Sequence, residues 1–239
     1  LGRILPALAA VTSTLLARGA TLAGLAVHES ILVLASVIVV LPGFTLTTAT
    51  TELATANIVS GTSRLMGAMT TLLQLGFGVA LAHRIAILFP GPEVPAPVEQ
   101  PLWWGLAASV FAALAFAVLL RAAPRDVPVI LLGAAVAVAG ARLGRVWLGP
   151  ELGAFVGSFL LGVAAHLHAR FRDRPVLLVL APGSLLMVPG SLGFLSVASM
   201  LDADVVPALQ TGFRMLLIAM SLAAGILLAT VAIPPRRAL

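Results

Sequence analysis

The chain has 239 residues, of which 60% are hydrophobic and only 10% are charged, and it contains no cysteine. An ordinary soluble domain carries about 25% charged residues, so this composition excludes a water-soluble globule and indicates an integral membrane protein. The absence of cysteine excludes disulfides and thiolate ligands. The net charge of +5 comes from arginines that lie singly or in short groups between apolar stretches, which favours a role in membrane topology over nucleic-acid binding.

The first part of the chain holds three apolar stretches. Residues 4–27 form a long stretch that Arg18 interrupts, residues 31–41 form a short stretch that ends at Pro42-Gly43, and residues 57–89 form another long stretch. The short stretch cannot easily cross about 30 Å of hydrocarbon at about 1.5 Å per residue, so we expect a broken helix there. The segment that follows it is rich in threonine, which makes lipid exposure unfavourable.

A proline-rich segment, residues 90–101, separates the two halves of the sequence. It contains five prolines and two glutamates, and because proline disrupts helices it predicts a linker. Five further apolar stretches follow the linker, and the fourth of them is short and ends at Pro189-Gly190. They cover residues 102–120, 127–141, 152–167, 176–188 and 205–233. The sequence therefore predicts an all-α protein with eight membrane helices, two of them short.

An internal repeat relates the two halves. Residues 1–88 align with residues 148–235 without a gap, which places Pro42-Gly43 on Pro189-Gly190 and keeps the order of long stretch, short stretch, Pro-Gly, polar segment and long stretch. Residues 102–147 have no counterpart, so we expect five helices per repeat and a first copy whose first two helices are missing here. An odd number of helices inverts the second copy in the membrane, an arrangement that recurs in secondary transporters.

The predicted organisation is therefore an inverted 5+5 transporter of ten helices. Residues 1–89 form the later part of the first repeat, residues 90–101 the linker, and residues 102–239 the complete second repeat. If the end of the chain lies in the cytoplasm, nine arginines fall on the cytoplasmic side and five on the other side. This distribution agrees with the positive-inside rule.

Two sequence patterns resemble the membrane part of the threonine/serine exporter family. The first is Leu41-Pro-Gly-Phe-Thr-Leu-Thr, followed by Ala56-Asn-Ile-Val-Ser-Gly-Thr-Ser-Arg-Leu65. The second is Leu186-Met-Val-Pro-Gly-Ser-Leu-Gly-Phe194, which leads to Leu201-Asp-Ala-Asp-Val205 and the closing Pro234-Pro-Arg-Arg. Family members often carry aspartate where this chain has Asn57. The resemblance covers essentially the whole chain.

This resemblance implies an antiporter that exports threonine and serine across the bacterial cytoplasmic membrane with the proton gradient as its energy source. Its expected partners are a small amino acid, protons and the lipid bilayer, and no cofactor is expected. The chain has no catalytic Ser/His/Asp order, Walker loop or metal-ligand spacing, which argues against an enzyme. Export of another small anion such as a dicarboxylate, or a role as a non-transporting scaffold, stays open, as does homo-oligomerisation.

The candidate substrate site lies in the polar segments after the two Pro-Gly pairs. A helix broken inside the membrane exposes backbone groups that need a cavity or a ligand, and the N-terminus of the new helix suits a carboxylate. The substrate-binding candidates are Thr45, Thr47, Thr48, Asn57, Arg64, Ser191 and Arg214. The alternative is that these segments are amphipathic surface helices and that the two arginines serve structural ion pairs or reach the lipid headgroups.

Three acidic residues near the breaks are candidates for proton coupling: Glu52, Asp202 and Asp204. A carboxylate in a desolvated site can take up and release a proton during a transport cycle. Glu52 is the preferred candidate because neutral polar residues surround it, whereas Asp204 is also placed to cap the last helix. Gln74 lies in the middle of an apolar stretch, where we expect it to form an interhelical hydrogen bond.

Overall fold

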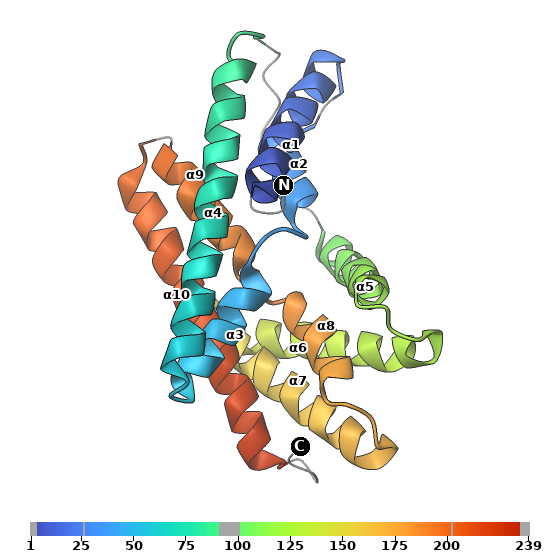
Figure 1. Cartoon of the computed structure of the whole chain (residues 1–239). Coiled ribbons are helices and arrows are strands. Elements are labelled where there is room, and N and C mark those ends of the chain that lie inside the picture. Colours follow the sequence, from blue (N-terminus) through green and yellow to red (C-terminus); the bar gives the residue numbers. More distant parts are fainter. Residues whose placement is uncertain (1–3, 26, 91–100, 202, 235–239) are drawn as a thin grey trace. The chain divides into compact units, whose positions relative to one another are not determined.

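The computed structural model describes residues 4–25, 27–90, 101–201 and 203–234, and within these ranges it contains helices and no strands (Figure 1). The α-helices are α1 (Leu5–Leu22), α2 (Glu29–Val37), α3 (Gly43–Ala54), α4 (Ile58–Ala86), α5 (Leu102–Leu119), α6 (Val127–Leu148), α7 (Pro150–Arg172), α8 (Leu177–Leu185), α9 (Gly190–Leu201) and α10 (Val205–Ala232). A short 3-10 helix, Pro124–Asp126, precedes α6. The predicted linker, apart from its first and last residues, lies outside the described residues.

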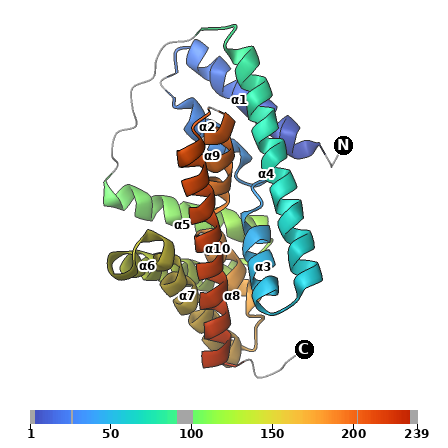
Figure 2. The ribbon, with the colours of Figure 1, turned by 90° about the vertical axis from the view of Figure 1, so that its left-hand side faces the viewer.

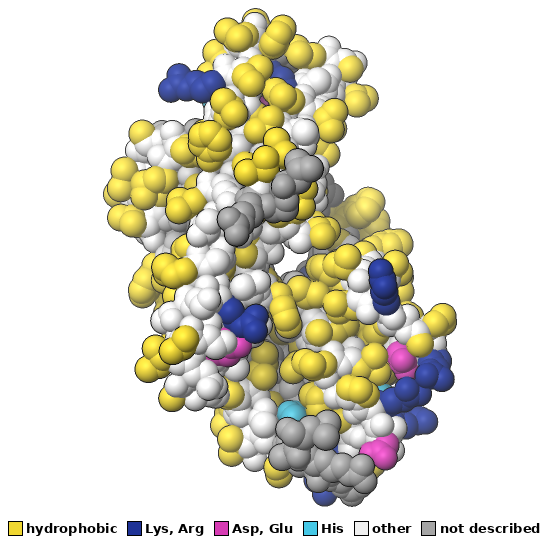
Figure 3. Space-filling view, in the orientation of Figure 1, with side chains coloured by type: hydrophobic (Ala, Val, Ile, Leu, Met, Phe, Trp, Pro, Cys, Tyr) yellow, Lys and Arg dark blue, Asp and Glu magenta, His cyan; other side chains and the backbone are white. Residues whose placement is uncertain are grey.

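Among the described residues, six helical stretches are long and apolar enough to cross a membrane. They are Leu5–Leu22, Ile58–Ala86, Pro124–Leu148, Pro150–Arg172, Leu177–Leu201 and Val205–Ala232. A shorter apolar helix covers Trp103–Leu119. Hydrophobic side chains cover much of the face drawn in Figure 3, and charged side chains gather in a few places on it. The chain is therefore an all-α, multi-pass membrane protein, as its composition predicts.

The helix boundaries follow the sequence at Pro42-Gly43 and Pro189-Gly190. α3 begins at Gly43 and α9 begins at Gly190, so each new helix starts directly after a proline. Proline lacks the backbone N–H that a helix interior requires but is tolerated at a helix start. The helices before the breaks, α2 and α8, have nine residues each and span only about 14 Å. Each is too short to cross the hydrocarbon layer alone.

The same repeat offset that aligns residue 1 with residue 148 also aligns the helices. It places the first and last residues of α3 on those of α9, and the first residue of α4 on the first residue of α10. The turns that join these helices also match. Ala56 and Ala203 occupy equivalent positions, with φ angles of 62° and 63°. In each turn the next backbone N–H, of Asn57 or Asp204, donates to the carbonyl five residues earlier, at 2.8 and 2.9 Å.

The chain divides into two compact units, and each unit takes segments from both halves of the sequence. Unit 1 consists of Leu1–Thr45, Ser63–Glu99 and Gly190–Met215, and unit 2 consists of Leu46–Thr62, Gln100–Pro189 and Leu216–Leu239. Helices α3, α4 and α10 contribute residues to both units. The two packing units therefore do not coincide with the two sequence repeats.

In unit 1, helices α1, α2, α4 and α9 share a core of small and aliphatic side chains with one aromatic ring. Its buried members are Ala10, Ala17, Val33, Val37, Leu75 and Phe194. α1 lies beside α4 in both Figure 1 and Figure 2. The two helices touch at Gly78, where a Cβ would overlap the carbonyl of Ala7. The missing side chain at Gly78 therefore permits this close approach.

In unit 2, helices α6 and α7 pack closely through glycines. A Cβ on Gly140 would lie 3.0 Å from the Cα of Gly157, and a Cβ on Gly144 would lie 3.0 Å from the Cα of Gly153. Glycines four residues apart form a flat strip on each helix, so that the two backbones can approach each other. The missing side chains at these four glycines therefore permit the close packing of α6 against α7.

Candidate functional site

The first residues of α3 and α9, which follow Pro42 and Pro189, meet inside unit 1. Gly43 and Gly190 are both buried, and a Cβ on Gly190 would lie 3.2 Å from the Cα and the N of Gly43. It would also lie 3.2 Å from the Cβ of Leu41. Since Gly43 and Gly190 are the first residues of α3 and α9, two helix N-termini come together at this point. A helix N-terminus carries a partial positive charge and favours an anionic group.

Two of the expected substrate-binding hydroxyls lie close in sequence to this meeting point. Thr45 follows Gly43 by two residues and Ser191 follows Gly190 directly, and both side chains are half-buried in unit 1. Neither hydroxyl forms a hydrogen bond with any residue that the structure describes. Both are therefore available to a ligand.

Other threonines of α3 use their hydroxyls within the helix. Thr50 donates to the carbonyl of Thr47 at 2.8 Å, and Thr51 donates to the same carbonyl at 2.8 Å. Thr50 is buried in unit 2, where it also approaches the carbonyl of Ala219 at 3.3 Å. The candidates Thr47 and Thr48 belong to unit 2, where Thr47 is buried and Thr48 is half-buried. This part of α3 is therefore packed against other helix residues and is not a freely exposed surface helix.

The acidic candidates occupy different surroundings. Glu52 is half-buried in unit 2, and its Oε2 accepts a hydrogen bond of 2.6 Å from the hydroxyl of Ser60. Asp204 is exposed in unit 1, and its carbonyl accepts the N–H of Ala208 at 3.0 Å as α10 begins. Asp202 lies outside the described residues. Glu52 and Asp204 are therefore not brought into one cluster within either unit.

The remaining candidates lie on exposed surfaces. The Asn57 side chain is exposed in unit 2 and donates to the hydroxyl of Thr55 at 3.1 Å. Arg64 and Arg214 have exposed side chains in unit 1. Gln74 is half-buried and forms no hydrogen bond with the residues in the described ranges, so the interhelical hydrogen bond expected for it is not formed.

An ion pair that the sequence analysis does not single out lies in unit 1. Arg18 Nη1 donates to Glu29 Oε1 at 2.8 Å, and the hydroxyl of Thr21 donates to the same oxygen at 2.8 Å. Burial raises the pKa of the Glu29 carboxyl, but the hydrogen bonds from Arg18 and Thr21 and the positive charges of Arg18 and His83 outweigh burial and lower it. Glu29 is the only acidic residue before Glu52 in the sequence. A single acidic residue in so apolar a part of the chain is the sequence feature that could have indicated an ion pair.

Glu29 also lines a cavity of about 840 Å³ in unit 1. Residues from α1, α2, α4 and α9 form its wall, and the polar ones among them are Thr14, Glu29, Ser30, His83 and Arg84. The remaining wall is apolar. A cavity of this size with a few polar groups is typical of a small-molecule site.

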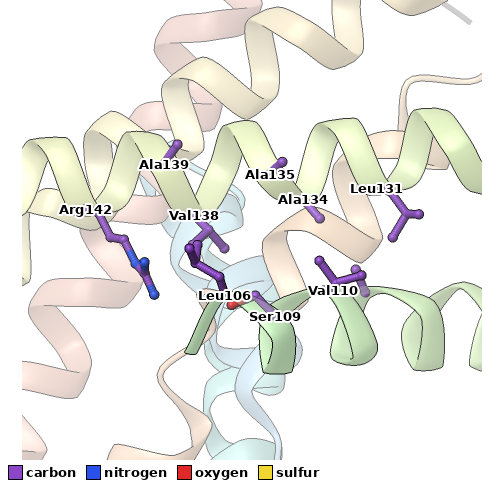
Figure 4. Close-up of a pocket in the computed structure, with 10 residues that line it drawn as sticks. Leu106, Ser109, Val110, Leu131, Ala134, Ala135, Val138, Ala139 and Arg142 are labelled. Carbon is purple, nitrogen blue, oxygen red and sulfur yellow. The ribbon is translucent and has the colours of Figure 1, made fainter. Parts of the chain in front are cut away.

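A second cavity, of about 420 Å³, lies in unit 2 between α5 and α6. Figure 4 shows that Leu106, Ser109 and Val110 of α5 face residues of α6, and that Arg142 extends from α6 at one end. Its wall is almost wholly apolar, and it contains none of the substrate-binding candidates. Among the described residues, no group of three or more His, Asp or Glu side chains is arranged to hold a metal ion.

Two family models match the chain. The model described as "Threonine/Serine exporter, ThrE" matches residues 105–232, more than half of the chain, and a second model for a threonine/serine exporter matches residues 2–86. Comparisons with curated proteins and with solved structures found no match. The two matched segments lie on either side of the proline-rich segment and contain both Pro-Gly breaks. The chain therefore belongs to the threonine/serine exporter family.

Proposed function

We propose that this chain exports the small hydroxyl amino acids threonine and serine across the bacterial cytoplasmic membrane, and that the proton gradient drives this export. The family supports transport as the general activity, and the apolar helices support a multi-pass membrane location. Threonine and serine as the substrates, and the proton as the coupling ion, are what we propose beyond this general activity.

The observation that carries the proposal is the meeting of two helix N-termini at Gly43 and Gly190. Backbone N–H groups at a helix start and the helix dipole together favour a bound carboxylate. The hydroxyls of Thr45 and Ser191 add neutral polar groups that suit the hydroxyl of threonine or serine. Arg64 and Arg214, which belong to the same unit as these helix starts, are further proposed substrate contacts. Thr47, Thr48 and Asn57 belong to unit 2, and their part in substrate binding is a separate proposal.

An inverted repeat would explain why two such helix starts exist. The matched bounds of α3 and α9, and the matched turns at Ala56 and Ala203, support two copies of one module. In transporters of this design, broken helices from the two copies form the substrate site near the middle of the membrane. We therefore place the substrate at the two Pro-Gly breaks.

Proton coupling requires a carboxylate whose protonation changes during the cycle. Glu52, Asp202 and Asp204 are the proposed carriers, and Glu52 is preferred because it is half-buried on the polar helix α3. Its hydrogen bond from Ser60 would be altered by protonation. Because Glu52 lies near the end of α3 and Ser60 near the start of α4, protonation would change the contact between these two helices at the turn that joins them.

The proposal is tested by measuring efflux from cells loaded with a threonine-containing dipeptide. Intracellular threonine is expected to fall faster in cells that express the chain than in cells with an empty vector, and an uncoupler should abolish the difference. Loading with a dicarboxylate in parallel tests the other substrate class. Equal rates of threonine loss with and without the chain would contradict export of threonine.

A further inference from the structure

The cavity of unit 1 has charged groups of both signs at its wall. Glu29 comes from the start of α2, and Arg84 comes from the last turn of α4. The wall also includes apolar side chains such as Val33, Phe77 and Phe194. Fixed charges beside an apolar wall would attract a small polar ligand and orient it.

One of the two carboxylate oxygens of Glu29 is available to a ligand. Its Oε1 accepts the hydrogen bonds from Arg18 and Thr21, each of 2.8 Å, whereas its Oε2 accepts none from the residues that the structure describes. Arg18 is itself held by a second bond, because its Nε donates to the carbonyl of Phe89 at 3.0 Å. The carboxylate is thus fixed in place on one side and available on the other.

Arg84 has an exposed side chain that forms no ion pair or hydrogen bond with other residues in the described part of the chain. Its guanidinium carries several N–H donors in one plane and suits a carboxylate. His83, the preceding residue, also lines the cavity. The wall therefore has an available cation as well as an available anion.

We infer that this cavity is a second amino-acid site, separate from the helix starts at Gly43 and Gly190, and that it binds the charged head of a free amino acid with the ammonium group on Glu29 Oε2 and the carboxylate on Arg84. This inference rests on the proposed function, because export of an amino acid requires a site for its zwitterion. A dicarboxylate fits less well because its second carboxylate would face the like charge of Glu29. Ser30, which follows Glu29 and lines the cavity, is placed for a hydroxyl on the ligand.

The test measures binding of radiolabelled threonine to the purified chain. Glu29→Gln and Arg84→Gln are each expected to weaken the component of threonine binding that belongs to this cavity about tenfold or more, since each removes a hydrogen bond between charged groups. Arg125→Gln is the matched control because Arg125 is exposed and is not among the residues that line this cavity. Wild-type binding by both cavity variants would overturn the inference, while the efflux assay would still decide the proposed function.

If Glu29→Gln folds poorly, binding of threonine analogues to the wild-type chain tests the same inference. N-acetylthreonine lacks the ammonium group and threoninamide lacks the carboxylate, so both should bind the wild-type chain about tenfold more weakly than threonine. Arg84→Gln should bind threonine and threoninamide equally. Equal binding of all three compounds by the wild-type chain, or tighter binding of succinate than of threonine, would overturn the inference.

Discussion

Gly190 and Gly43 touch where α9 and α3 begin, and a Cβ on Gly190 would lie 3.2 Å from the Cα of Gly43. Neither residue has a positive φ angle, so backbone conformation is not the reason for glycine here. The reason is space, because two buried helix starts meet without an intervening side chain. The distance between the two helix N-termini is thus set by the absence of side chains at Gly43 and Gly190.

The first prediction concerns that distance. Gly190→Ala places a methyl group in tight contact with the Gly43 backbone, so the helix starts must separate by a few tenths of an ångström, and overpacking of this kind costs about 1–3 kcal/mol. Threonine efflux should fall severalfold. Gly67→Ala is the control, since a Cβ there has no neighbour within 4 Å. Equal efflux by the two variants, at equal protein levels, would contradict a role for this contact.

The sequence predicts the helix breaks well because their cause is local. A proline lacks the backbone N–H that an uninterrupted helix requires, so Pro42 and Pro189 favour helix starts, although Pro182-Gly183 lies inside α8 without ending it. The starts of α3 and α9 follow directly after these prolines. The same holds for the glycine strip of α6 and α7, since its spacing along each helix is visible in the sequence.

Contacts between distant residues could not be predicted in the same way. The contact of Gly190 with Gly43 joins residues far apart in the chain, and nothing local to either glycine specifies its partner. The pair of Arg18 and Glu29 joins residues of two different helices, and no local pattern in the sequence links them. Gln74 was expected to bond to another helix, but polar residues in membrane helices can also face a cavity, and spacing alone does not distinguish the two cases.

The second prediction concerns the pH dependence of stability at Glu29. Its pKa is lowered in the folded protein, so its contribution to stability is present above the unfolded value of about 4.3 and is lost as the pH falls through the folded value. The groups that face it are Arg18, Thr21 and His83. Glu29→Gln should lower the melting temperature at pH 7, and the difference from wild type should shrink as the pH falls below about 4.

Thermal unfolding in detergent across this pH range measures the effect. The shift is expected to be small, because the Glu29 side chain is 32% exposed and solvent screens the pair. A difference between wild type and variant that stays constant from pH 7 to the acid limit would show that the ion pair does not stabilise the fold.

The third prediction concerns the turns that join α3 to α4 and α9 to α10. Ala56 and Ala203 have left-handed φ angles of 62° and 63°, a conformation that costs an alanine about 1 kcal/mol and a glycine almost nothing. Ala56→Gly and Ala203→Gly should therefore each raise the free energy of unfolding by up to about 1 kcal/mol. Ala135→Gly is the control, because Ala135 is an exposed residue inside α6 and glycine there should be destabilising. Lower melting temperatures for both turn variants would contradict this account.

The last prediction concerns the glycine strip of unit 2. A Cβ on Gly153 would lie 2.7 Å from the carbonyl oxygen of Ala141 and 2.8 Å from the backbone N of Arg145. These neighbours are backbone atoms of α6, so no side-chain rotation can relieve the overlap and α7 must move away. Gly153→Ala is expected to destabilise the protein by about 1–3 kcal/mol. Gly19→Ala, in α1, has open space around the added Cβ and should leave the melting temperature unchanged or raise it, since alanine favours a helix. Thermal unfolding of both variants in the same detergent measures the difference, and equal melting temperatures would show that α6 and α7 do not depend on this close packing.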